Sequence, residues 1–188
     1  MRSVFLLPIF LLVYITGSSQ GLSFYKENIT MKITKGYFHV TGIYYLRNDR
    51  NSSEILIYPY PVDSLYGPVD SIYIYNMTTH KNITPLKTDL YKTVFKLDFS
   101  YPGDLVIQIS YRQRLIGNHA EYILKSTISW KQPLNQADYQ LIVPSGLQIS
   151  SFSMVPHDSI VTDQEVVYLW NKYNYMPSEN LIFEYKNR

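Results

Sequence analysis

The stretch Leu105-Val-Ile-Gln-Ile-Ser-Tyr-Arg112 places apolar side chains at every second position. Its odd-numbered residues are Leu, Ile, Ile and Tyr, whereas Gln108, Ser110 and Arg112 are polar. Because successive side chains of a β-strand point to opposite faces, this alternation predicts a strand with one face in a core and the other in water.

Similar short runs continue to both sides of this stretch, separated by turn formers such as Pro102-Gly103 and Pro144-Ser-Gly146. About eleven such strands without helices predict an all-β fold, an antiparallel β-sandwich of immunoglobulin-like or jelly-roll-like type. A closed barrel, or two small β domains divided near Gln132-Pro133, are the alternatives. The expected strands are Phe24–Thr34, Tyr37–Arg47, Glu54–Tyr60, Val69–Asn76, Leu90–Phe99, Asp104–Leu115, Ala120–Trp130, Tyr139–Val143, Leu147–Met154, Glu165–Asn171 and Leu181–Lys186.

Gly117-Asn118 predicts a tight hairpin turn between the quoted stretch and the run Ala120–Trp130. In the register set by a two-residue turn, Leu105 faces Trp130 on the apolar side of the hairpin. Trp130 and Trp170 are both expected to be buried core residues, and the hairpin predicts that Trp130→Ala is among the most destabilising substitutions.

The N-terminus carries the pattern of a secretory signal peptide. Arg2 precedes an apolar run, Val4–Ile15, and small residues follow it, so cleavage is expected after Ser19 or Gly21. The run is short for a membrane-spanning helix, which needs roughly 20 apolar residues, although an uncleaved anchor is the alternative. We therefore expect a signal peptide over residues 1–20 and a single β-sandwich domain over residues 22–188, without a transmembrane segment in the mature chain. The protein would be exported, to the periplasm, the cell surface or the extracellular space.

Charge and cysteine content exclude several functional classes. The chain has 17 Lys+Arg against 15 Asp+Glu, a net charge of +2, which disfavours nucleic-acid binding because that requires a clustered basic surface. It has no cysteine, and an exported domain without disulfides is typical of the bacterial cell envelope. Four Asn-x-Ser/Thr triplets are interpreted as markers of surface loops; they begin at Asn28, Asn51, Asn76 and Asn82.

Two segments resemble exported bacterial β-sandwich domains of unknown function. One is Leu115-Ile-Gly-Asn-His-Ala-Glu-Tyr-Ile-Leu-Lys-Ser-Thr-Ile-Ser-Trp130 with the following Lys131-Gln-Pro-Leu-Asn-Gln-Ala-Asp-Tyr139, and the other is Tyr58-Pro-Tyr-Pro61. In such domains a strand ends in a buried Trp and a Pro-Leu turn follows. The resemblance covers about a quarter of the chain and implies a fold, without an activity.

Motifs for catalysis and metal binding are missing from the sequence. The four histidines, His39, His80, His119 and His157, form no His-x-His or His-x₃-His pair. There is no Gly-x-Ser-x-Gly nucleophile motif and no glycine-rich phosphate loop. The acidic residues are expected in turns or on polar faces. We therefore predict no catalytic residue, no metal site and no cofactor.

Tyrosine is the most informative residue type, with 19 copies. Tyrosine combines a flat apolar ring with a hydroxyl, which suits contacts with proteins and sugars. In Val69–Asn76, Tyr73 and Tyr75 share the face opposite the isoleucines, and Tyr58 and Tyr60 would extend that platform if the preceding strand pairs alongside. The resulting hypothesis is a non-enzymatic envelope protein that binds a protein partner or a glycan through this aromatic surface. The alternative is an exported hydrolase whose catalytic residues converge from separate strands.

Overall fold

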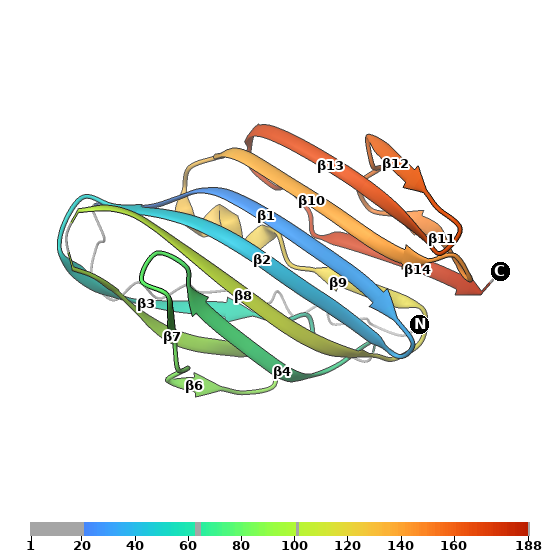
Figure 1. The fold of residues 1–188 in the computed structure, drawn as a ribbon, viewed down its shortest axis with the longest axis horizontal. Coiled ribbons are helices and arrows are strands. Elements are labelled where there is room, and N and C mark those ends of the chain that lie inside the picture. The colour runs from blue at the N-terminus through green and yellow to red at the C-terminus, as the bar shows by residue number, and fades with distance from the viewer. Residues whose placement is uncertain (1–20, 63–64, 101, 188) are drawn as a thin grey trace, which may run out of the picture.

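A computed structural model of the chain describes residues 21–62, 65–100 and 102–187 (Figure 1). The signal-peptide prediction for residues 1–20 lies outside these residues. The elements in chain order are β1 (Leu22–Thr34), β2 (Tyr37–Asn48), β3 (Ser52–Pro59), β4 (Tyr66–Asn76), β5 (Lys81–Asn82), β6 (Lys87–Thr88), β7 (Lys92–Phe99), β8 (Gly103–Leu115), β9 (His119–Tyr122), the 3₁₀ helix η1 (Lys125–Trp130), β10 (Leu134–Pro144), β11 (Leu147–Phe152), β12 (Asp158–Val161), β13 (Glu165–Tyr175) and β14 (Leu181–Asn187).

The strands form one large sheet and two small ones. The main sheet has eight strands in the order β12-β13-β10-β1-β2-β8-β4-β5, and the small sheets are β11-β14-β9 and β3-β7-β6. All pairs are antiparallel except β1 with β10, which run parallel, so the main sheet is mixed. The predicted all-β sandwich is confirmed. None of the helices in the described residues is long and apolar enough to cross a membrane.

Both small sheets cover the same face of the main sheet, here called its inner face. Phe38 and Tyr44 point to this face from alternate positions of β2. Phe38 packs on Phe183 of β14 with ring centroids 6.4 Å apart, and Tyr44 packs on Tyr58 of β3 with centroids 6.0 Å apart. One contiguous apolar core joins all three sheets, because each buries its apolar side against the others.

The predicted hairpin at Gly117-Asn118 is wrong. Strand β8 already uses both of its edges in the main sheet, where it pairs with β2 and β4. Leu105 therefore faces Leu46, and the chain after Gly117-Asn118 crosses to the small sheet, where β9 pairs with β14. The Tyr185 backbone N–H donates to the Asn118 carbonyl at 3.0 Å, which fixes this crossover.

The run Ala120–Trp130 is also not one strand. Strand β9 ends at Tyr122, and the 3₁₀ helix η1 follows from Lys125 to Trp130. The Asn180 side-chain oxygen accepts hydrogen bonds from the backbone N–H groups of Leu124 and Lys125, at 3.0 Å each. These N–H groups therefore have an acceptor without pairing with a neighbouring strand. As a result Trp130 packs against the edge of the core and is half-buried, whereas Trp170 on β13 is 1% exposed.

Two of the Asn-x-Ser/Thr triplets do not mark surface loops. Asn28 lies within β1 in the middle of the main sheet, and Asn76 is buried at the end of β4. Asn76 accepts a hydrogen bond from the Thr79 backbone N–H at 2.9 Å, so its side chain caps the turn that follows β4. Asn51 and Asn82 are exposed.

Candidate functional site

Tyr73 and Tyr75 lie on the outer face of the main sheet, which neither small sheet covers. Their rings are nearly parallel, with an interplanar angle of 14° and centroids 6.1 Å apart. Tyr73 is 46% exposed, and its hydroxyl donates to the Asn82 side-chain oxygen at 2.7 Å. Ile74 occupies the opposite face and is buried in the core. The two rings therefore form an ordered pair that is open to solvent on one side.

Tyr58 and Tyr60 do not extend this pair. Strand β3 pairs with β7 rather than with β4, so both tyrosines lie on the inner side of the main sheet. Tyr60 is buried, and its hydroxyl is 2.6 Å from the Thr93 hydroxyl. Tyr58 packs edge-on against Tyr111, with centroids 5.8 Å apart. The sequence could not assign β3 to a sheet, because alternation shows which residues share a face but not which strand lies alongside.

A row of small polar side chains continues from Tyr73 across the outer face. The strand registers place Tyr73 beside Ser110, Ser110 beside Thr41, Thr41 beside Thr30, and Thr30 beside Gln140. The Ser110 hydroxyl donates to the Thr41 hydroxyl at 3.2 Å, and the Gln140 amide donates to the Thr30 hydroxyl at 2.6 Å. The row thus offers hydroxyl and amide groups on one face of the sheet beside an aromatic pair.

Charged groups border this row. Arg112 forms a two-pronged pair with Asp70, at 2.8 Å and 3.0 Å, and its guanidinium lies over the Tyr37 ring at 4.6 Å from the centroid. His39 lies near Arg112. Its partial burial and, to a smaller extent, the positive charge of Arg112 lower the pKa of its imidazole below the ordinary value. The lowered pKa favours the neutral imidazole of His39.

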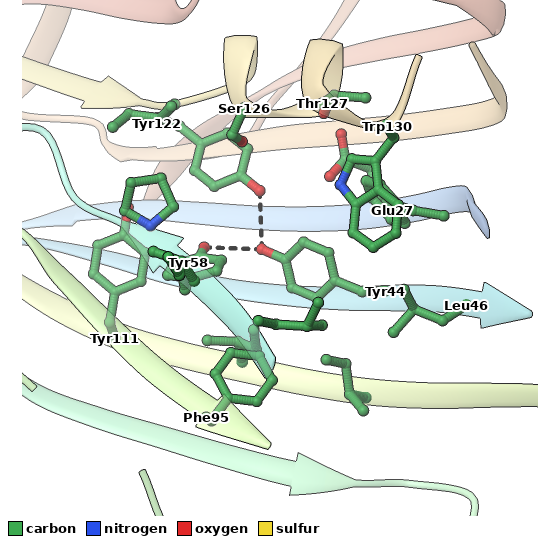
Figure 2. A pocket seen from close by; sticks show the side chains of 17 residues that line it. Glu27, Tyr44, Leu46, Tyr58, Phe95, Tyr111, Tyr122, Ser126, Thr127 and Trp130 are labelled. Carbon is green, nitrogen blue, oxygen red and sulfur yellow. Dashed lines mark hydrogen bonds between the residues drawn. The ribbon is translucent and has the colours of Figure 1, made fainter. Parts of the chain in front are cut away.

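On the inner face, a cavity of about 80 Å³ lies where the two small sheets meet over the main sheet (Figure 2). Strands β1, β2 and β8 supply its floor, β3 and β7 one wall, and β9 with η1 the other wall. Most of the side chains that line it are apolar or aromatic. They are Phe24, Glu27, Tyr44, Leu46, Leu56, Ile57, Tyr58, Pro59, Phe95, Ile107, Ile109, Tyr111, Tyr122, Ile123, Ser126, Thr127 and Trp130.

Three tyrosine hydroxyls meet at this cavity. The Tyr44 hydroxyl lies 2.8 Å from that of Tyr58 and 2.9 Å from that of Tyr122, so side chains from β2, β3 and β9 form one hydrogen-bonded chain (Figure 2). Burial raises the pKa of each hydroxyl above its ordinary value, so all three stay protonated over the physiological range. These hydrogen bonds link the three sheets, and each buried hydroxyl has a hydrogen-bond partner.

Glu27 is the unexpected residue of the cavity. It is 2% exposed, and its Oε1 accepts a hydrogen bond from the Tyr139 hydroxyl at 2.7 Å. Burial raises the pKa of its carboxyl from 4.5 to about 7, although hydrogen bonds from Tyr139 and Tyr122 oppose the rise. The signal in the sequence was its phase, because Glu27 alternates with the same set as Ile29 and Met31 and so had to face the core.

Gly42 makes room for this arrangement. A Cβ atom at Gly42 would lie within 2.5 Å of ring atoms of Tyr44, because the Tyr44 ring lies back along its own strand. Only glycine permits this approach on the inner face of β2. Gly42 therefore sets where the Tyr44 hydroxyl meets Tyr58 and Tyr122, and the sequence pattern gave no indication of that role.

Comparison with known proteins finds structures of similar fold but assigns the chain to no protein family. No protein-family model matches the chain. No curated protein sequence matches it either.

Solved structures do resemble it. A proposed nutrient-binding protein from Legionella pneumophila has a TM-score of 0.59 at 13% identity, over 89% of this chain and 68% of that one. An M1 zinc metallopeptidase from Deinococcus radiodurans has a TM-score of 0.53 at 10% identity, over 88% of this chain. The chain spans only 42% of the peptidase's length. At these identities the likeness concerns the fold.

Proposed function

We propose that this chain is an exported, non-enzymatic binding domain of the cell envelope, and that the outer face of its main sheet binds a glycan. The observation that carries the proposal is the nearly parallel ring pair of Tyr73, which is exposed, and Tyr75, which is half-buried. Aromatic rings offer the flat apolar surface on which the C–H face of a sugar can lie, at a low cost in side-chain entropy.

The neighbouring polar row suits the hydroxyl groups of a sugar. Ser110, Thr41 and Thr30 present hydroxyl groups, and Gln108 and Gln140 present amides, on the face that carries the tyrosines. Such groups both donate and accept hydrogen bonds, as sugar hydroxyls do. The fold likeness to a proposed nutrient-binding protein is in keeping with a binding role. A protein partner on the same surface is the other outcome that the test below distinguishes.

The hydrolase alternative receives less support. Glycoside hydrolysis needs two carboxyl groups roughly 5–10 Å apart, and nucleophilic hydrolysis needs a base beside the nucleophile. Of the described residues that line the inner cavity, Glu27 is the one carboxylic acid, and none is a histidine. Across the described ranges, no group of three or more His, Cys, Asp or Glu side chains is placed to hold a metal ion.

The binding experiment compares a double variant with a matched control. Tyr73→Ala with Tyr75→Ala removes the ring pair, and Tyr173→Ala removes a lone tyrosine that is 71% exposed on β13 of the same sheet. Binding to a glycan array, insoluble peptidoglycan and chitin should fall at least tenfold for the double variant only, with an unchanged melting temperature. Retained glycan binding, or glycan binding by no form of the protein, would overturn the proposal. Loss of a captured protein instead would assign the surface to a protein partner.

Export has its own test. N-terminal sequencing of secreted protein is expected to begin at Gln20 or Leu22, the two residues that follow the small-residue cleavage frames. Secreted material that still begins at Met1 would overturn the signal-peptide prediction.

A further inference from the structure

The inner cavity contains an acid without a basic partner. Glu27 is almost completely buried, and no Lys, Arg or His is found among the described residues that line the cavity. Every described salt bridge joins other residues. An ionised carboxylate taken out of water is costly unless a positive charge or several donors compensate it. When Glu27 is ionised, tyrosine hydroxyls are its hydrogen-bond donors, and no positive charge among the described lining residues compensates it.

Aromatic rings surround the space beside this acid. Phe24 packs between Tyr44 and Trp130, with centroid distances of 5.9 Å and 5.7 Å, and all three rings line the cavity. The faces of such rings attract an ammonium group through the ring quadrupole. An inorganic cation would lose its water shell against these walls, whereas an organic ammonium ion has an apolar body that the walls accommodate.

The volume and lining limit the ligand further. A cavity needs roughly 10–15 Å³ to hold one water molecule, so about 80 Å³ accommodates a body of about five to eight non-hydrogen atoms. An amino acid would bring a carboxylate, for which the described lining offers no cation. On the side of β3 and η1 the lining is partly accessible to solvent, because Ile57, Tyr58, Ser126 and Trp130 are half-buried.

We propose that this cavity binds a small organic ammonium ion with a single positive charge, whose charge pairs with Glu27 and whose alkyl body packs against Phe24, Tyr44 and Trp130. The site lies on the opposite side of the main sheet from Tyr73 and Tyr75, so this inference stands or falls independently of glycan binding.

Binding should depend on pH through Glu27. Its pKa of about 7 places the exchange between carboxyl and carboxylate in the neutral pH range. Tyrosines from five other strands face Glu27, and burial raises the pKa of each. They are Tyr44 of β2, Tyr58 of β3, Tyr122 of β9, Tyr139 of β10 and Tyr175 of β13. They stay neutral between pH 5 and 8, so Glu27 alone sets the dependence. Below pH 7 the affinity should fall about tenfold for each pH unit, since the cation must displace a proton.

Isothermal titration calorimetry with n-butylammonium chloride on the unmodified protein measures this directly. Tryptophan emission provides a second signal, because Trp130 lines the cavity and Trp170 does not. n-Butanol is the neutral probe of matched size. We expect butylammonium to bind at least tenfold more tightly than butanol at pH 8, and the difference to vanish near pH 5. Equal affinities, no binding of butylammonium, or a pH-independent affinity would overturn the proposal.

Substitutions supply the residue-level test. Glu27→Gln keeps the shape and the acceptor for Tyr139 and should reduce butylammonium affinity at least tenfold at pH 8 while leaving butanol binding unchanged. Glu184→Gln, on an exposed carboxyl of β14, is the matched control and should change neither. Retained butylammonium binding by Glu27→Gln would contradict the assignment, and if this variant does not fold, the pH profile of the unmodified protein decides.

Discussion

Replacing Glu27 by Gln should change how the stability of this protein depends on pH. The carboxyl pKa is about 7 in the folded protein, against an ordinary value of 4.5 that applies to the unfolded chain. A raised pKa means that the folded state binds the proton more tightly than the unfolded state does. Its contribution to stability is therefore complete below pH 4.5 and is lost as the pH rises through 7.

The size of this effect follows from the same two values. One pKa unit corresponds to about 1.4 kcal/mol, so the interval between 4.5 and about 7 corresponds to roughly 3 kcal/mol of unfolding free energy. Glutamine does not titrate, and its amide retains an oxygen for the Tyr139 hydroxyl. The free energy of unfolding of Glu27→Gln minus that of the unmodified protein should therefore increase by about 3 kcal/mol between pH 4 and pH 8.

Urea unfolding of both proteins at unit pH intervals measures this difference. Both carry His39, whose lowered pKa favours stability at higher pH, and both carry Asp89 and Asp98, whose lowered pKa values matter below about pH 4. These contributions cancel in the comparison. Parallel stability curves for the two proteins would show that the Glu27 carboxyl titrates normally, and the physical reasoning about the cavity would then be refuted.

Two further predictions concern packing. Gly42→Ala should destabilise the protein by about 1–3 kcal/mol because the new methyl group displaces the Tyr44 ring, and the affinity for butylammonium should also fall. Urea unfolding measures the stability and titration calorimetry the affinity. An unchanged stability would show that the Tyr44 ring can move aside. Trp170→Ala should cost about 3–5 kcal/mol because the indole is fully buried and its Nε1–H donates to the Met154 carbonyl at 2.9 Å. Trp130→Ala should cost clearly less, since the ring is half-buried, and equal losses in thermal unfolding would contradict this order.

The alternating runs were sufficient to predict most strands, because alternation is a local property of the backbone. Leu105–Arg112 lies in the middle of β8 with the predicted face inward, and Tyr73 points away from the core for the same reason. The burial of Glu27 also follows from local alternation, because Glu27 shares the phase of Ile29 and Met31 in β1. The binding role assigned to the tyrosines stays a prediction.

Which strands lie side by side was decided by tertiary structure. Gly117-Asn118 has the composition of a hairpin turn, but both edges of β8 were taken by β2 and β4, so β9 had to pair with β14. Pairing joins residues far apart in the chain, and its free energy depends on the whole core rather than on the turn between two strands. For the same reason Tyr58 lies at the inner cavity, where its hydroxyl contacts that of Tyr44, instead of lying beside Tyr73. Residues from all three sheets line the cavity around Glu27. The sequence pattern of one sheet does not indicate where the other two sheets pack, so the cavity could not be predicted from the sequence.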